Sequence, residues 1–299
     1  MRRRLLLTAP ALLAVRPARA AGVLRVAYAG SMGVVMDRVL GPEFGAANAV
    51  AFQGTGQGAF GLARLLAAKT LQADVFVSVT PGPIRLLEAA GLVKDAVPIA
   101  STAMVIAYSP RSRFAPALKA AASPWWEVLR SPGLRFGRTD PITDPQGRNI
   151  IFTMQLAERY YRAPGFARAV LGADGNPAQI FTEPSLLSRL ESGQIDASSG
   201  YQSAVAAHHL PYVALPPEIN LSDPAYDAAW YSKAAITLPQ PGGGTKDVYP
   251  EPLVFYAALL EDAPSPELGR RFVAFLTSDP GQERLREGGY GPPKGGSIA

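Results

Sequence analysis

Four short segments rich in glycine, hydroxyl and amide side chains have residue types that could bind a small anion. Each follows a predicted strand and precedes a predicted helix, which is the edge at which open α/β sheets bind ligands. They are Ala29–Gly33, Gln53–Gly58, Asp140–Gly147 and Gly200–Ser203. Backbone N–H groups at helix N-termini, together with neutral side-chain donors, can hold such an anion. Because these segments contain no Lys or Arg, the pattern favours a dehydrated oxyanion held by uncharged donors.

Each segment also has a purely structural interpretation as a helix cap. Ser31 and Thr55 belong to residue types that cap helices far more often than they bind ligands. Asp140 and Asp144 could form a carboxylate dyad, but each precedes a proline, and Asp-Pro is common at turns. The presence of four such segments in one chain favours the binding interpretation.

An enzyme interpretation remains as an alternative. Ala29–Gly33 matches a relaxed nucleophile elbow with Ser31 as the nucleophile, and the available bases would be the adjacent His208 and His209. This would make the chain an exported serine hydrolase. As a metal site, two neighbouring histidines without an acidic or cysteine partner at ligand spacing are weakly supported, and a solvated helix end is favoured.

Neither a nucleotide nor another cofactor is predicted. Gly54, Gly56 and Gly58 do not have the G-x-G-x-x-G spacing, and no phosphate-binding Lys follows them. Trp125 and Trp126 are expected to pack between helices. We therefore expect a binding protein that has no cofactor and is not an enzyme.

The net positive charge of the chain comes from its first twenty residues. The 299 residues include 29 Lys and Arg against 24 Asp and Glu, which gives a formal charge of +5. The first twenty residues hold five arginines and no acid: Arg2, Arg3, Arg4, Arg16 and Arg19. The rest of the chain is formally neutral, so its overall charge does not favour a polyanion, and we predict no nucleic-acid partner.

The same twenty residues have the pattern of an export signal. Three arginines precede the mostly apolar run Leu5–Val15, and Ala18-Arg19-Ala20 is a small-x-small cleavage site. The arginines also fit the twin-arginine form of signal. The apolar run is too short for a membrane span, which needs about 20 residues. Cysteine is absent, which excludes disulfides, thiolate metal sites and lipid attachment. We expect cleavage after about Ala20 and release into the periplasm.

The elements that must position these segments alternate between strands and helices. Strands are predicted at Val23–Tyr28, Val50–Gln53, Ala73–Val79, Met104–Tyr108, Leu134–Gly137, near Ala197 and at Val254–Leu259. Helices are predicted at about 34–40, 150–161, 185–191 and 267–276. This βα order predicts parallel sheets covered on both faces. The length favours two α/β lobes: residues 21–105 in lobe I, 106–250 in lobe II, and 251–299 returning to lobe I.

The order of several motifs resembles a known family. The motifs are Ala29-Gly30-Ser31, a glycine turn before Leu62-Ala63-Arg64, Ala73–Phe76, Phe136-Gly137 followed by Asp140-Pro141 and Asp144–Gly147, Leu190–Asp196, Leu215–Leu221, and the closing Phe272–Leu276, Gly281-Gln282 and Gly289-Tyr290. Together they resemble the molybdate/tungstate-binding proteins of ABC importers, and their tungstate-binding branch in particular. The likeness covers residues 23 to 290 with gaps.

The resemblance implies a type II periplasmic binding protein. Its two lobes, each a mostly parallel sheet flanked by helices, would close over tungstate or molybdate and deliver it to a membrane permease. We expect a monomer. The same fold binding another anion, such as sulfate, is a further alternative.

The resemblance also implies roles for individual residues. Ser31 would donate its hydroxyl and a nearby N–H, and the turn containing Thr55 and Gln57 would supply a second donor from lobe I. Gln146 would donate its backbone N–H. Tyr201 would donate its hydroxyl, and Glu183 its N–H rather than its carboxylate.

Two positions depart from the tungstate-binding pattern. In that branch two carboxylates contact the metal of the oxyanion. Asp144 matches the first of them, but Gly200 stands where the second is expected. The family's serine in the second turn aligns with Gln57, or with Thr55 after a small shift. Two unit charges about 4 Å apart repel by roughly 4 kcal/mol at an effective dielectric of 20, and a dianion doubles this. Asp144 must therefore contact the metal, be protonated or turn away.

Overall fold

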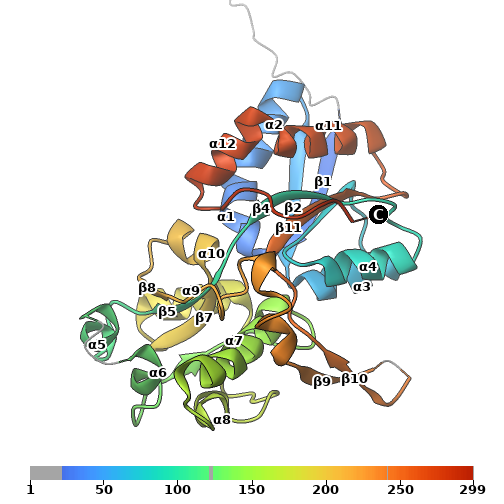
Figure 1. The fold of residues 1–299 in the computed structure, drawn as a ribbon. Coiled ribbons are helices and arrows are strands. Elements are labelled where there is room, and N and C mark those ends of the chain that lie inside the picture. The colour runs from blue at the N-terminus through green and yellow to red at the C-terminus, as the bar shows by residue number, and fades with distance from the viewer. Residues whose placement is uncertain (1–21, 121–123, 241, 299) are drawn as a thin grey trace, which may run out of the picture.

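Lobe I is built on a five-stranded sheet in the order β2-β1-β3-β11-β4 (Figure 1). The computed structural model describes residues 22–120, 124–240 and 242–298, so the predicted export signal lies outside the described residues. The strands are β1 (Val23–Ala29), β2 (Ala51–Gln57), β3 (Val75–Ser78), β4 (Val97–Ser101) and β11 (Val254–Leu259). Every residue of β3 is buried, as expected for a central strand covered on both faces.

Helices cover both faces of this sheet. The chain after β1 forms η1 (Gly30–Met32), α1 (Gly33–Val35), the π-helical turn η2 (Met36–Leu40) and α2 (Gly41–Asn48). Figure 1 shows α2, α11 (Pro266–Thr277) and α12 (Asp279–Glu287) on one side, and α3 (Ala59–Ala67) and α4 (Pro81–Ala89) on the other. Pro81 and Pro266 occupy first-turn positions, where a missing N–H costs nothing.

Lobe II is built on a four-stranded sheet in the order β6-β7-β5-β8. Its strands are β5 (Met104–Tyr108), β6 (Phe136–Gly137), β7 (Ala197–Tyr201) and β8 (Tyr212–Ala214). The helices are α5 (Ala115–Ala120), α6 (Trp125–Val128), α7 (Pro145–Tyr161), α8 (Phe166–Leu171), α9 (Glu183–Ser192) and α10 (Gln202–Ala207). Two short turns, η3 (Pro224–Tyr226) and η4 (Tyr231–Lys233), precede a hairpin of β9 (Ile236–Pro239) and β10 (Thr245–Val248).

The predicted two-lobed α/β architecture is confirmed, but the sheets are mixed rather than mostly parallel. In lobe I, β1 runs parallel to β2 and β3, whereas β11 runs antiparallel to β3 and β4. In lobe II, β5 is antiparallel to β7 and β8, and only β6 and β7 are parallel. The antiparallel strands β5 and β11 are those that carry the chain from one lobe to the other.

The predicted strand at Val50–Gln53 extends through the glycine-rich segment, so the expected turn there was wrong. The strand continues to Gln57, in register with β1. A Cβ on Gly54 would lie 2.5 Å from the Tyr28 hydroxyl oxygen, and one on Gly56 would lie 2.6 Å from Tyr28 Cε2. These two glycines therefore make room for the Tyr28 side chain, whose hydroxyl donates to Asp37 Oδ1 at 2.5 Å.

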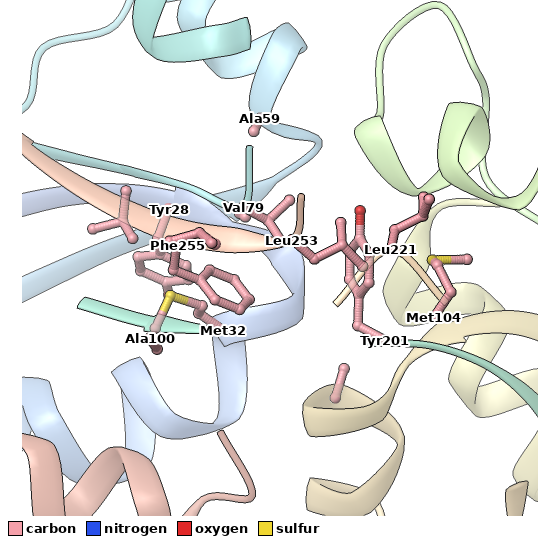
Figure 2. Packing of buried hydrophobic residues seen from close by; sticks show 14 of the residues in the cluster. Tyr28, Met32, Ala59, Val79, Ala100, Met104, Tyr201, Leu221, Leu253 and Phe255 are labelled. Atoms are coloured by element: carbon pink, nitrogen blue, oxygen red, sulfur yellow. The ribbon is translucent and has the colours of Figure 1, made fainter. Parts of the chain in front are cut away.

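Three segments lie side by side where the chain crosses between lobes. The N–H of Thr102 donates to the Leu253 carbonyl at 3.1 Å, and the N–H of Leu253 donates to the Leu221 carbonyl at 2.8 Å. Figure 2 shows Leu253 on the lobe I side of Tyr201, and Leu221 on its other side near Met104. Residues 102–103 link β4 of the lobe I sheet to β5 of the lobe II sheet, and the boundary that we expect after residue 105 lies within β5.

The tryptophan pair packs within lobe II. Trp125 lies edge-on to Tyr161 and Phe166, at centroid distances of 5.9 and 5.5 Å. Trp126 stacks on Tyr161. The expected packing role of Trp125 and Trp126 is confirmed. Among the described residues, no helix has the length and apolar character needed to cross a bilayer.

Candidate functional site

A cavity of about 760 Å³ lies between the two lobes. From lobe I it is lined by Gly30, Gly56, Gln57, Gly58 and Gly61, and from lobe II by Thr139, Asp140, Thr143, Asp144 and the segment 180–184. These residues belong to the carboxyl-end segments of β1 and β2, to the loop before α7 and to the start of α9. Strand ends and helix N-termini thus converge on one space, as in other ligand-binding α/β folds.

The lobes touch at the edge of this cavity. The N–H of Gly61 donates to the Thr143 carbonyl at 3.2 Å, and Arg64 Nη2 donates to the Ile142 carbonyl at 3.3 Å. Gly58 packs so closely on lobe II that a Cβ there would lie 2.8 Å from the Thr143 oxygen. The two lobes are therefore in direct contact on this side of the cavity.

Asp144 is the N-cap of α7. Its Oδ1 accepts a hydrogen bond from the Gln146 N–H at 2.9 Å, and Pro145 follows at the first helical position. Burial raises the pKa of Asp144 to about 6, and Asp140 contributes in the same direction, while the Gln146 N–H, Thr139 and Arg148 oppose the shift. The backbone N–H of Gln146, expected to face the ligand, is thus bound to the Asp144 side chain in this state.

The side chain of Gln146 links β7 to α9. Ser199 Oγ donates to Gln146 Oε1 at 2.9 Å, and Gln146 Nε2 donates to Glu183 Oε1 at 3.1 Å. Glu183 is the first residue of α9 and only 7% exposed. Burial raises the pKa of Glu183 well above its ordinary value, the charge of Asp144 adds to the shift, and the hydrogen bond from Gln146 opposes it.

Tyr201 ends β7 beside the same helix. Its hydroxyl oxygen accepts a hydrogen bond from Asn149 Nδ2 at 3.0 Å, and the side chain is 1% exposed. Burial raises the pKa of Tyr201, and the nearby Asp144 and Glu183 act in the same direction. Its hydroxyl is therefore a neutral donor at physiological pH.

Ser31 carries a buried hydroxyl that has no hydrogen-bond partner among the described residues. It lies in η1, next to Gly30 of the cavity lining, and is 5% exposed. Tyr290 donates its hydroxyl to the Ser31 carbonyl at 2.8 Å, which fixes the backbone of this turn from the C-terminal segment. A buried hydroxyl without a partner is costly, and a bound ligand would relieve that cost.

The structure brings most of the predicted site residues into one region, but not Thr55. Gln57, Asp144 and Glu183 line the cavity, and the side chain of Gln146 is hydrogen-bonded to Glu183. Ser31 is next to Gly30 of the lining, and Tyr201 lies near Asp144 and Glu183. Thr55 lies inside β2, paired with Ala27, and does not line the cavity. Its place in the strand follows from the extension of β2 described above.

A side chain at position 200 would point away from the cavity, toward a different part of lobe II. A Cβ there would lie 2.5 Å from Val205 Cγ2 and 3.7 Å from Ala107 Cβ. Because strand neighbours point to opposite faces, Tyr201 faces α7 while position 200 faces the small core around Val205. An acid at this position would point away from the cavity.

Sequence reasoning missed Ser199, Asn149 and the carboxylate of Glu183. Two local signals could have indicated the first two residues. Ser199 lies two positions before Tyr201 and so shares its strand face, and Asn149 lies three positions after Gln146 on the same helix. The burial of the Glu183 carboxylate depends on the contact between the lobes and has no local signal.

Among the described residues, neither His208 nor His209 is hydrogen-bonded to Ser31. His208 Nδ1 lies 2.9 Å from Glu191 Oε1, at the exposed end of α10. Ser31 Oγ has no hydrogen-bond partner among the described residues. Within residues 22–120, 124–240 and 242–298, no three His, Cys, Asp or Glu side chains group as metal ligands.

Known proteins resemble this chain along most of its length. The family model described as "Bacterial extracellular solute-binding protein" matches residues 24–291. The molybdate/tungstate-binding protein WtpA of Pyrococcus abyssi is 34% identical over 207 residues, and that of Thermococcus kodakarensis is 33% identical over 207. The matched regions cover 63% of this chain in both cases, and 59% and 57% of the respective relatives. The chain thus spans less than two thirds of these relatives.

Solved structures share the fold at low identity. The periplasmic molybdate-binding protein of Azotobacter vinelandii superposes with a TM-score of 0.64 at 14% identity, covering 91% of this chain and 100% of that one. The sulfate-binding protein SubI of Mycobacterium tuberculosis gives 0.58 at 15% identity, covering 91% and 86%. The fold is that of the type II periplasmic binding proteins. Taken with the match over residues 24–291, the chain belongs to the bacterial extracellular solute-binding protein family.

Proposed function

We propose that the protein is the periplasmic binding component of an ABC importer for molybdate or tungstate. The lobes close over the oxyanion, and the closed form delivers it to a permease in the cytoplasmic membrane. The protein acts without a cofactor and without catalysis, as a monomer. Export and cleavage of the predicted signal, residues 1–20, place it in the periplasm.

The cavity between the lobes carries this proposal. Its lining joins strand ends and helix starts from both lobes and contains no Lys, Arg or His among the described residues. Two neutral hydroxyls lie next to residues of its lining: Ser31 adjoins Gly30, and Tyr201 lies near Asp144 and Glu183. The relatives named as molybdate/tungstate-binding proteins support the choice of anion.

Closure accounts for selective retention of the anion. Gly61 and Arg64 of lobe I contact the loop that leads into α7, and that loop carries Asp144 into the cavity. Donors from both lobes are complete only in the closed form, so the ligand favours that form by its differential affinity. Exclusion of water strengthens each hydrogen bond to the anion.

A thermal-shift screen of the mature protein tests the proposal. Tungstate, molybdate, sulfate, phosphate and chromate are compared at equal concentration. A ligand at about 100 times its dissociation constant stabilises the fold by about 2.7 kcal/mol. We expect the largest shift with tungstate or molybdate. A shift with sulfate alone would identify the same fold as a receptor for a different anion, and labelling of Ser31 by a fluorophosphonate would support a hydrolase.

A further inference from the structure

Two buried carboxylates share the cavity without a cation. Asp144 and Glu183 are 8% and 7% exposed, and both line the space between the lobes. Asp140 lines it too. An oxyanion with two negative charges would meet like charges here, so a carboxyl group that faces the bound anion must be neutral, turn away or contact the metal of the anion.

The hydrogen bonds around Glu183 distinguish its two oxygens. The Ser199 hydroxyl donates to Gln146 Oε1, which leaves the Gln146 Nε2 group to donate to Glu183 Oε1. Glu183 Oε1 is thereby an acceptor. Glu183 Oε2 points toward the η1 turn, 3.0 Å from where a Cβ on Gly30 would be, and no described residue donates to it. Oε2 is the oxygen that is free to carry a proton and donate it.

Asp144 is better suited than Glu183 to hold a negative charge. Its Oδ1 accepts the Gln146 N–H at the start of α7, where the helix dipole favours an anion. Arg148, one turn further along α7, also favours the ionised form of Asp144. Among the described residues a single amide donates to Glu183, and Asp144 disfavours its charge.

Within the described part of the chain, the titratable groups that act on Glu183 from the surrounding elements are all acids. They are Asp144 on the loop into α7, Tyr201 at the end of β7 and Tyr290 in the C-terminal segment. Gly30, on the η1 side, contributes no charge. No Lys, Arg or His of the described residues lines this cavity.

We propose that Glu183 enters the anion complex as a neutral carboxylic acid and donates a hydrogen bond from Oε2 to the bound oxyanion. The proposal rests on the proposed function and concerns the same site. The proton is taken from solvent whenever the free site is ionised, and the oxyanion itself remains unprotonated. Binding above the pKa of Glu183 in the free protein therefore takes up one proton.

Titration calorimetry with sodium molybdate tests this on the mature protein. The titrations run from about pH 7, above the pKa of about 6 of Asp144, to about pH 9. Two buffers of different ionisation enthalpy at each pH give the number of protons taken up. We expect a constant Kd at the acidic end, then a loss of about tenfold per pH unit with uptake of one proton.

Three variants identify the residue that carries the proton. Glu183→Gln keeps an N–H donor at this position but cannot ionise, so its Kd should be independent of pH, with no proton uptake. Asp144→Asn should still take up a proton, with its loss of affinity starting at lower pH because a neighbouring charge is gone. Glu191→Gln, on the exposed face of the same helix, should titrate like the unaltered protein.

A second measurement does not depend on affinity. The molybdate-induced infrared difference spectrum should contain the carbonyl band of a protonated carboxyl group, absent in Glu183→Gln. The proposal is overturned if proton uptake persists in Glu183→Gln, or if the Kd of the unaltered protein does not change up to pH 9. Absence of any molybdate or tungstate binding by folded, unaltered protein would instead remove the proposed function.

Discussion

The backbone N–H of Gly61 donates a hydrogen bond to the carbonyl oxygen of Thr143 at 3.2 Å. Gly61 belongs to α3 of lobe I, and Thr143 to the loop that leads into α7 of lobe II. The same loop carries Asp144, so the contact that joins the lobes also sets the position of a cavity-lining carboxyl group. Closure and assembly of the site are thus one event.

Close packing at Gly58 should make closure sensitive to a single methyl group. In Gly58→Ala the new Cβ would lie 2.8 Å from the Thr143 oxygen, so the lobes cannot approach as closely. Overpacking of this kind costs roughly 1–3 kcal/mol, which corresponds to an affinity for molybdate about 5- to 150-fold weaker. Calorimetry measures the change. Gly33→Ala, where nothing lies within 4 Å, is the matched control and should bind normally.

Phe60 should stabilise the closed form through Arg148. The Arg148 guanidinium carbon lies 3.8 Å from the Phe60 ring centroid, and the two residues come from different lobes. Loss of a cation–π contact costs roughly 0.5–2 kcal/mol, so Phe60→Leu should bind molybdate about 2- to 30-fold more weakly. The radius of gyration in solution without ligand should increase. Phe114→Leu removes a similar contact with Arg113 inside lobe II and should change neither measurement; equal effects of both variants would disprove the interlobe role.

Ser31→Ala should separate affinity from stability. The Ser31 hydroxyl is buried and unpartnered among the described residues, so its removal should leave the ligand-free protein as stable or about 1 kcal/mol more stable. A hydrogen bond to a charged group is worth about 1.5–3 kcal/mol, so oxyanion affinity should fall roughly 10- to 150-fold. Thermal unfolding and calorimetry test the two effects. Ser188→Ala, on the exposed face of α9, is the control, and unchanged affinity in Ser31→Ala would exclude this hydroxyl as a ligand donor.

Stability should decrease with rising pH because of Asp144. Its pKa rises from 3.8 to about 6 on folding, mainly by burial, so the native state holds more protons than the unfolded state between these values. The free energy of unfolding therefore falls as pH increases through that window, by on the order of 2–3 kcal/mol. In Asp144→Asn, which retains an N-cap residue, the decrease should be smaller, because only the contribution of Asp144 is removed and that of Glu183 remains.

Melting temperatures of ligand-free protein from pH 4 to pH 7 test this dependence. Asp262→Asn, at an exposed position, controls for the loss of one charge. Identical profiles for the unaltered protein and Asp144→Asn would mean that Asp144 is not perturbed by burial.

Gly200 should tolerate no side chain. The Cβ of Gly200→Ala would lie 2.5 Å from Val205 Cγ2, so we expect destabilisation of roughly 1–3 kcal/mol. Gly200→Glu should be worse, since the acid would enter an apolar cluster. Chemical denaturation measures both. Gly175→Ala, with no neighbour within 4 Å, should be neutral, and a Gly200→Glu protein that is stable and binds more tightly would place this side chain in the cavity after all.

Local sequence patterns were sufficient to predict some strands and helices but not the full length of β2. The strand expected at Val23–Tyr28 and the helix expected at 267–276 match β1 and α11 to within one residue at each end. The helix expected at about 150–161 begins earlier, at Pro145, because Asp144 caps it. The extension of β2 through its glycines depends on Tyr28, which belongs to another strand, so no local rule could reveal it.

The residues of the candidate site likewise include some that local sequence patterns indicate and one whose position depends on a tertiary contact. Asp144 and Gln146 lie in a turn with a recognisable cap, and Tyr201 follows a buried strand. The carboxylate of Glu183 lies on the first turn of a helix, where acids are usually solvated because they favour the helix dipole. Its burial results from the approach of η1 across the cleft, a tertiary contact that sequence spacing does not encode.

The position of β11 between β3 and β4 has a consequence for synthesis on the ribosome. β4 joins the lobe I sheet only through β11, which is made after the whole of lobe II. Until residues 254–259 emerge, β3 has one unpaired edge and β4 has no partner strand, and such edges are prone to aggregate. The nascent chain can therefore fold lobe II first. The lobe I sheet, whose strands β1 to β4 are synthesised earlier, is completed only when β11 is added.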